Sequence, residues 1–432
     1  MSESTSERDG SREPSLPTTP FHVLGIAFLL AGFALALYQG LQEFALVPRV
    51  SWITWTHIHF VTVGAFTQLL FGTLPRLTAR RLGVESPSRR YERASFLGLN
   101  AALLAAWYGR AFGEPLWFDV GLATLWLLTL ALLVVLLATV RRAGCARDPT
   151  IGFYLLSPLV YLIGLTFAFG LFSHAWDLPG GWYGLREGHV HANAWGFLGL
   201  AAIGTLYDVF PRLVDLDADV GVDRLRRYSF PLFAVGILPL AFGPVLGMGR
   251  TVTAAGLLLY AVGYLLYVAS LVRAYRAGTP NGTALWVLVA QAWILGPAGF
   301  APFILFGVPL GIPDAWIETG ALHFFFLGWA LPVALAGALL YVGSREGPTD
   351  GAGYGGHPLV PDGGVPSVVG APTVLAWNVA VLLIGVGFFY QDQAWSASLH
   401  AVGYAVVLAV WGYYLARIAG RWRTARAVAA TA

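Results

Sequence analysis

THIHFVTVGAFTQLLFG, residues 56–72, is the first of three related stretches in this chain. The others are GHVHANAWGFLGLAAIG at 188–204 and GALHFFFLGWALPVALAG at 320–337. Each contains a histidine followed five residues later by a glycine, and 132 residues separate each histidine from the next: His59, His191 and His323, with Gly64, Gly196 and Gly328. A constant period of this length predicts three four-helix units related by pseudo-threefold symmetry.

The composition around these stretches is that of a membrane protein. The 432 residues are 57% hydrophobic and 11% charged, whereas soluble domains are about a quarter charged. Apolar runs long enough to cross a bilayer occur about twelve times: 21–46, 52–77, 95–112, 116–140, 151–172, 189–210, 229–246, 252–272, 284–306, 315–342, 372–390 and 395–418. The sequence therefore predicts an all-α, polytopic membrane bundle of about twelve transmembrane helices, forming one domain over residues 21–418.

The distribution of basic residues predicts the orientation. All 26 basic residues are arginine, and if the N-terminus is cytoplasmic, all but four lie on the cytoplasmic side; the exceptions are Arg49, Arg110, Arg186 and Arg250. The positive-inside rule then predicts a multi-pass protein of the plasma (cytoplasmic) membrane, with lipid around it and both termini in the cytoplasm. Residues 1–20 are expected to form a disordered cytoplasmic tail, 343–370 a Gly/Pro-rich cytoplasmic loop and 419–432 a basic cytoplasmic tail. Because topology explains the net charge of +3, we expect no nucleic-acid partner.

The histidines are the residues that point to chemistry. They lie within two or three turns of the predicted outer ends of the second, sixth and tenth helices, where an unpaired imidazole is costly to bury. In an α-helix, residues i and i+2 project about 200° apart, so His57 with His59, and His189 with His191, should each serve two sites on opposite sides of a helix. The glycine after each histidine would admit either a flat macrocycle or a neighbouring helix.

Imidazole is the usual axial ligand of haem iron, and the single cysteine, Cys145, excludes covalent haem attachment through two thioethers. A bound haem would therefore be non-covalent and, we expect, b-type. The alternative for the histidines is ordinary hydrogen bonding between helices. Further candidates lie on the same predicted side of the membrane. They are His400 and His174 as accessory imidazoles, Glu187 and Glu318 as proton relays or imidazole partners, and Arg49, Arg110, Arg186 and Arg250 as partners of haem propionates. The alternative for each of them is a purely structural or solvated role.

Twelve helices, internal termini, threefold quasi-symmetry and histidines on helices two, six and ten resemble subunit I of the haem–copper oxidase superfamily, which includes terminal oxidases and nitric oxide reductases. The resemblance covers residues 21–418. It implies a low-spin haem ligand on the second helix and a His-x-His on the tenth, whose first member binds the high-spin haem and whose second binds the low-spin haem. It also implies copper ligands on the sixth helix and a His-His pair on the seventh.

Carried over, the resemblance makes His323 and either His57 or His59 low-spin haem ligands, and it puts His191 or His189 at a copper position. The sequence departs from the family pattern at the binuclear centre. Ala321 stands where the high-spin haem ligand is expected, the stretch from Tyr228 has no His pair, and the chain has no lysine for a lysine-dependent proton channel. These departures indicate an oxidase-like scaffold with a degenerate binuclear centre.

Applying the threefold operation to the family geometry pairs His323 with His57, and His59 with His189, and it places His191 opposite Ala321. We therefore expect two bis-histidine, low-spin haems, with His191 left for a five-coordinate or copper-like third site. The predicted function is electron transfer, or reduction or sensing of oxygen or nitric oxide. Any enzyme activity would be that of an oxidoreductase of the cytochrome oxidase or nitric oxide reductase type. Its electron donor would be a quinol, a cytochrome or a small copper protein. The alternative is a cofactor-free transporter, which should show broken helices and polar groups near the bilayer centre.

Overall fold

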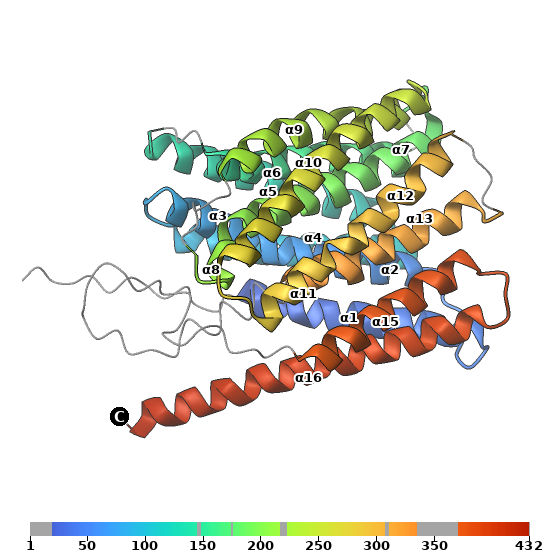
Figure 1. Cartoon of the computed structure of the whole chain (residues 1–432). Coiled ribbons are helices and arrows are strands. Elements are labelled where there is room, and N and C mark those ends of the chain that lie inside the picture. Colours follow the sequence, from blue (N-terminus) through green and yellow to red (C-terminus); the bar gives the residue numbers. More distant parts are fainter. Residues whose placement is uncertain are drawn as a thin grey trace, which may run out of the picture.

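The computed structural model describes residues 20–144, 148–173, 176–216, 223–306, 311–334 and 370–431. The predicted tail before residue 20, almost all of the predicted loop 343–370, Cys145 and His174 lie outside these ranges. Within them, every regular element is helical, and Figure 1 shows the helices packed side by side in one bundle. The all-helical fold class is confirmed for the described part of the chain.

The first half of the bundle contains two long spans that are each built from three consecutive helical segments. α1 is Pro20–Glu43, and the next span joins α2, η1 and α3. The other long span joins α7, η2 and α8. In order, the segments are α2 Ile53–His59, η1 Phe60–Thr67, α3 Gln68–Arg81, α4 Arg89–Phe112, α5 Pro115–Arg142, α6 Pro149–Ser173, α7 Gly181–Val190, η2 His191–Gly199 and α8 Leu200–Leu213.

In the second half, α11 and α12 are separated at Gln291, and α13 continues into η3. The segments are α9 Asp223–Val245, α10 Arg250–Ala277, α11 Gly282–Ala290, α12 Ala292–Phe306, α13 Asp314–His323, η3 Phe324–Ala330, α15 Ala371–Phe389 and α16 Ser396–Thr431. The helix of α16 continues through the stretch predicted as a basic tail, and in Figure 1 it extends beyond its neighbours.

Eleven helical stretches of the described chain are long and apolar enough to cross a membrane. The predicted span 95–112 is the one that does not meet this description, although it is fully helical as part of α4. Its sequence begins RRYERAS and ends with an arginine in the last turn, and these polar residues lower the hydropathy of a 24-residue helix that is otherwise comparable with its neighbours. α4 packs along α5. A multi-pass membrane architecture is therefore shown, and the count of twelve spans stays a prediction.

Three π-helical segments occupy equivalent places in the chain. η1 follows His59, η2 begins at His191 and η3 follows His323. π-helical turns are rare and frequently occur at functional sites, because the i→i+5 hydrogen bonds widen the helix and are less favourable than those of an α-helix. All three histidine-bearing spans therefore change their helical geometry next to the histidine.

The repeated glycines lie inside these π-helical segments and allow close packing of the preceding span. A Cβ on Gly64 would lie 2.7 Å from Cγ of Phe28 in α1, a Cβ on Gly196 would overlap Val160 of α6, and a Cβ on Gly328 would overlap Trp293 of α12. Of the two roles expected for these glycines, the structure therefore supports the close approach of a neighbouring helix in all three places.

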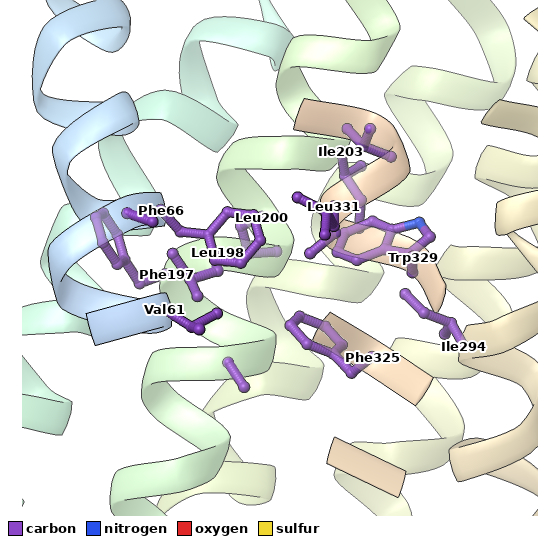
Figure 2. Close-up of a cluster of buried hydrophobic side chains, with 14 of the residues drawn as sticks. Val61, Phe66, Phe197, Leu198, Leu200, Ile203, Ile294, Phe325, Trp329 and Leu331 are labelled. Carbon is purple, nitrogen blue, oxygen red and sulfur yellow. The ribbon is translucent and has the colours of Figure 1, made fainter. Parts of the chain in front are cut away.

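The three histidine-bearing spans meet in one hydrophobic core. Figure 2 shows Val61 and Phe66 of η1 facing Phe197 and Leu198 of η2, with Phe325 and Trp329 of η3 nearby. Phe197, Phe325 and Trp329 have no exposed surface. This packing fixes the three spans relative to one another, so that the histidines at their beginnings are held in a defined arrangement.

A buried charge cluster ties the opposite ends of two of these spans together. The Asp208 carboxylate of α8 is 1% exposed and accepts hydrogen bonds from Arg80 (3.0 Å), Arg81 (2.7 Å) and Arg212 (3.1 Å). Arg81 also pairs with Asp148 at the start of α6. Buried ion pairs are strongly destabilising when one partner is removed, so this cluster locks the end of the bundle that is remote from the histidines.

Candidate functional site

His57 and His323 come from helices far apart in sequence and lie next to each other. Their ring centroids are 6.5 Å apart with an angle of 39° between the rings. Nδ1 of His323 lies 2.7 Å from the Thr319 carbonyl oxygen, so Nδ1 carries the proton and Nε2 is left with a free lone pair. Nδ1 of His57 is buried and makes no hydrogen bond. We call this pair the first site.

The separation of these two rings fits one metal between them. Imidazole nitrogens bind metals at about 2.0 Å, and a ring centre lies about 1.1 Å behind its nitrogen, so two imidazoles on opposite sides of one iron have centroids about 6.2 Å apart. The 6.5 Å seen between His57 and His323 is close to this value. The hydrogen bond from His323 to a carbonyl one turn earlier is the kind of contact that orients a metal-binding imidazole.

His59 and His189 form a second pair, on the other side of α2. The His59 ring stacks on Trp55 with centroids 4.0 Å apart, and its Nδ1 lies 2.8 Å from the Trp55 carbonyl oxygen. His189 Nδ1 lies 2.8 Å from the carbonyl oxygen of Gly164 in α6. The two imidazoles are close enough to interact electrostatically. We call this pair the second site.

The second site is less ready to bind a metal than the first. Nδ2 of Asn193, one turn beyond His189, lies 3.2 Å from His189 Nε2 and 3.0 Å from Nδ1. Since Nδ1 already donates to the Gly164 carbonyl, Nε2 is the atom that can accept from the amide. Binding of a metal at Nε2 therefore requires the Asn193 side chain to turn away. The sequence carries a signal for this contact, because His-x-x-x-Asn places both side chains on one helix face.

All four histidines line one cavity of ≈530 Å³, a volume typical of cofactor sites, which measure about 300–1,000 Å³. The lining is mainly apolar. It includes Phe33, Val61, Phe326, Leu327 and Tyr404 from α1, η1, η3 and α16, and Trp55, Phe118, Leu125, Leu165 and Phe197 from α2, α5, α6 and η2. This cavity, which we call the larger cavity, therefore connects the first site with the second.

His191 lies in a different cavity, of ≈480 Å³, which we call the smaller cavity. Ala321 lines the same cavity, so the structure places His191 and Ala321 on one space, as the threefold rule expects. The His191 ring is close to the Leu240 backbone, which engages at most one of its two nitrogens. Among the described residues, no three His, Cys, Asp or Glu side chains are arranged to hold a metal ion, so a copper site at His191 stays a prediction.

The carboxylates near the histidines belong to an ion-pair group at the smaller cavity. Arg186 pairs with Glu318 and, at 3.1 Å, with Glu187. Arg186 lines both cavities, and both glutamates line the smaller one. Sequence reasoning named these three residues without pairing them. The signal was present, because Arg186 and Glu318 are 132 residues apart, the same period that separates the histidines.

The remaining candidates have more peripheral places. His400 is 3% exposed and is separated from His323 by Phe388, whose ring centroid lies 4.1 Å from each imidazole. Arg110 interacts electrostatically with His59, Arg250 lines the smaller cavity, and Arg49 is exposed in the segment between α1 and α2. Comparisons with protein-family models and with curated proteins give no match. The resemblance to haem–copper oxidases therefore stays an expectation, and function has to be argued from the site.

Proposed function

We propose that this chain is an integral membrane redox protein that holds two low-spin b-type haems without covalent attachment. His57 and His323 would hold one haem at the first site, and His59 and His189 would hold the other at the second. The observation that carries the proposal is the 6.5 Å separation of the His57 and His323 rings across an apolar cavity, with Nδ1 of His323 already held by a carbonyl. The equivalent π-helical segments and glycine contacts support the pseudo-threefold relation between the units.

The chain's own residues perform three tasks at these sites. The Trp55 and Thr319 carbonyls fix the tautomers of His59 and His323, so that Nε2 of each is available as a ligand. The apolar side chains of the larger cavity exclude water, which favours a neutral imidazole and a non-covalently held macrocycle. A bound haem would supply one-electron chemistry. Because two positions of α2 separated by a single residue serve the two sites, the pathway between the sites is short.

Electron transfer is the function that this arrangement supports best. Two imidazoles on one iron leave no open coordination position, whereas reduction of oxygen or nitric oxide needs one. The larger cavity offers two such pairs, and His191 has no facing histidine. We further propose that the protein crosses the plasma membrane twelve times with both termini in the cytoplasm, so that the haem sites lie in the outer half of the bilayer.

The break between α11 and α12 at Gln291 is the feature that would favour a transporter, since transporter sites are typically built at interrupted helices. The Gln291 side chain is, however, buried and already hydrogen-bonded within the bundle. Its Oε1 accepts hydrogen bonds from Tyr264 and Trp329, both at 2.8 Å, and its Nε2 donates to the Val287 carbonyl at 2.7 Å. Both acceptor positions of the amide oxygen and one of the two N–H groups are therefore held by the protein, which makes this break a poorer substrate site than an interrupted helix with free polar groups.

The decisive experiment is a haem count with an optical spectrum on the purified protein. We expect two haems per chain, extracted by acidified solvent, and a reduced-minus-oxidised spectrum of low-spin b-type haem. A colourless protein purified from haem-replete cells, with the same helical content by circular dichroism, would leave the transporter as the better reading.

A further inference from the structure

The smaller cavity is not explained by two haems in the larger one. It has a volume of ≈480 Å³ and is lined by α7, η2, α9, α10, α12 and α13. It stands at the third position of the repeat, where His191 faces Ala321 in place of a second imidazole. The space therefore calls for a ligand of a different kind.

The cavity reaches the lipid-facing surface of the bundle. Leu265 of α10 and Leu295 of α12 both line it, and they are 56% and 44% exposed within segments that are long and apolar enough to cross the membrane. An exposed leucine at this depth faces lipid, because hydrocarbon surrounds such segments. A ligand can therefore enter from the side, between α10 and α12, and such a ligand has to be lipophilic.

The inner wall offers flat aromatic faces and one hydrogen-bonding ring. The hydroxyls of Tyr260 and Tyr264 are already bonded, to the Trp195 carbonyl at 2.9 Å and to Gln291 Oε1 at 2.8 Å. With their hydroxyls occupied, these two residues and Trp195 contribute mainly apolar surface to the cavity. His191 remains as the group that can donate to, or accept from, an oxygen atom on a ligand.

The charged end of the cavity is balanced and suits a neutral head group. Its lining has two arginines, Arg186 and Arg250, and two glutamates, Glu187 and Glu318, and Arg186 pairs with both glutamates. The two positive and two negative side chains give this end of the cavity no net charge. A neutral ring with oxygen substituents and an apolar tail needs no counter-ion there and leaves the Arg186 ion pairs in place.

We propose that the smaller cavity is a binding site for a membrane quinone or quinol. The ring lies between the aromatic residues with one oxygen hydrogen-bonded to His191, and the tail leaves past Leu265 and Leu295 into the bilayer. The proposal rests on the proposed redox function, for which it names the lipid-soluble partner, but its binding test does not depend on haem.

The test measures binding of heptyl hydroxyquinoline N-oxide, a quinol analogue whose fluorescence is quenched when it binds. The protein is held in lipid nanodiscs, and the haem spectrum is recorded on the same samples. Leu295→Trp fills the lateral opening, and Leu285→Trp is its matched control: Leu285 is 45% exposed on α11 and does not line the cavity. We expect one saturable site per chain and about tenfold weaker binding for Leu295→Trp, with Leu285→Trp equal to the native chain.

His191→Phe should also weaken binding about tenfold, since it removes one hydrogen bond in an apolar site, and His191→Gln should restore part of the affinity. Equal affinity in the two tryptophan variants, or no saturable binding by a haem-loaded native chain, would overturn the quinone site and leave the haem proposal intact. Saturable binding by a chain that holds no haem would do the reverse, supporting the quinone site and refuting the proposed haem function.

Discussion

Replacement of His323 by alanine tests the pairing of axial ligands most directly. The first site contains one histidine from α2 and one from α13, and the second site contains a different histidine from α2. If each pair holds one haem, His323→Ala removes a ligand from one haem only. The haem at the second site then reports, within the same molecule, that the variant has folded.

The expected magnitude follows from the geometry. The rings of His57 and His323 stand 6.5 Å apart, which leaves room for one iron and no other axial ligand between them. Deleting either imidazole should therefore reduce the haem content from two per chain to about one, and any haem retained at the first site should be high-spin. The double variant His57→Ala with His323→Ala should lose no more haem than either single variant, because both act on one site.

The assay combines a haem count with optical and electron paramagnetic resonance spectra of the oxidised protein. Free imidazole added to His323→Ala should restore the low-spin spectrum, since the deleted ring leaves a space of its own size. His400→Ala is the matched control: His400 is 3% exposed and lies one aromatic ring further away, behind Phe388, so both haems should remain low-spin. Two unchanged low-spin haems in His323→Ala, or loss of the first haem in His400→Ala alone, would refute the assigned ligand pair.

Three further substitutions test the scaffold. Asp208→Asn leaves three guanidinium groups around an uncharged side chain and should destabilise the protein by about 3–5 kcal/mol. Glu92→Gln removes the charge from a partly exposed ion pair and should destabilise the protein by less than about 1 kcal/mol. Thermal unfolding in detergent compares the two variants. Gly64→Leu should lower the unfolding temperature because its Cβ would lie 2.7 Å from a phenylalanine ring, and Gly412→Leu, with nothing within 4 Å, should not. Ala321→His completes the third histidine pair, so a haem count should rise and binding of the quinol analogue should weaken.

Much of this arrangement could be predicted from the sequence because it depends on local periodicity. The run of apolar segments predicts the helices, and the opposite directions of residues i and i+2 predict that His57 and His59 face two different sites. The period of 132 residues also relates His59, His191 and His323, which all stand beside a π-helical segment in the structure. These inferences need only the geometry of one helix and a repeat length.

The π-helical segments themselves are harder to predict. Hydrophobic patterns do not distinguish i→i+4 from i→i+5 hydrogen bonds over seven to nine residues, although the five-residue spacing from His59 to Gly64 equals one i→i+5 step. α4 shows the opposite problem. Its helix is clear from the sequence, but charged residues at both ends, Arg93 and Arg110 among them, make the assignment of a membrane span depend on where the helix sits.

The smaller cavity could not be predicted because it depends on contacts between distant helices. Its opening is set by how Leu265 of α10 and Leu295 of α12 pack, and nothing in either local sequence determines the gap between them. The contact between Asn193 and His189 was available from the spacing of one helical turn, but the hydrogen bond to Gly164 comes from α6 and required the tertiary structure.

The proposed threefold relation also accounts for the different third position. It pairs each of residues 59, 191 and 323 with residue 189, 321 or 57 of the next unit. His323 lies beside His57, His59 and His189 line the larger cavity, and His191 and Ala321 line the smaller one. Under this relation, an alanine in place of an imidazole removes the second metal ligand from the third site alone. That single difference would separate two sites suited to haem from a third suited to a neutral lipophilic ring.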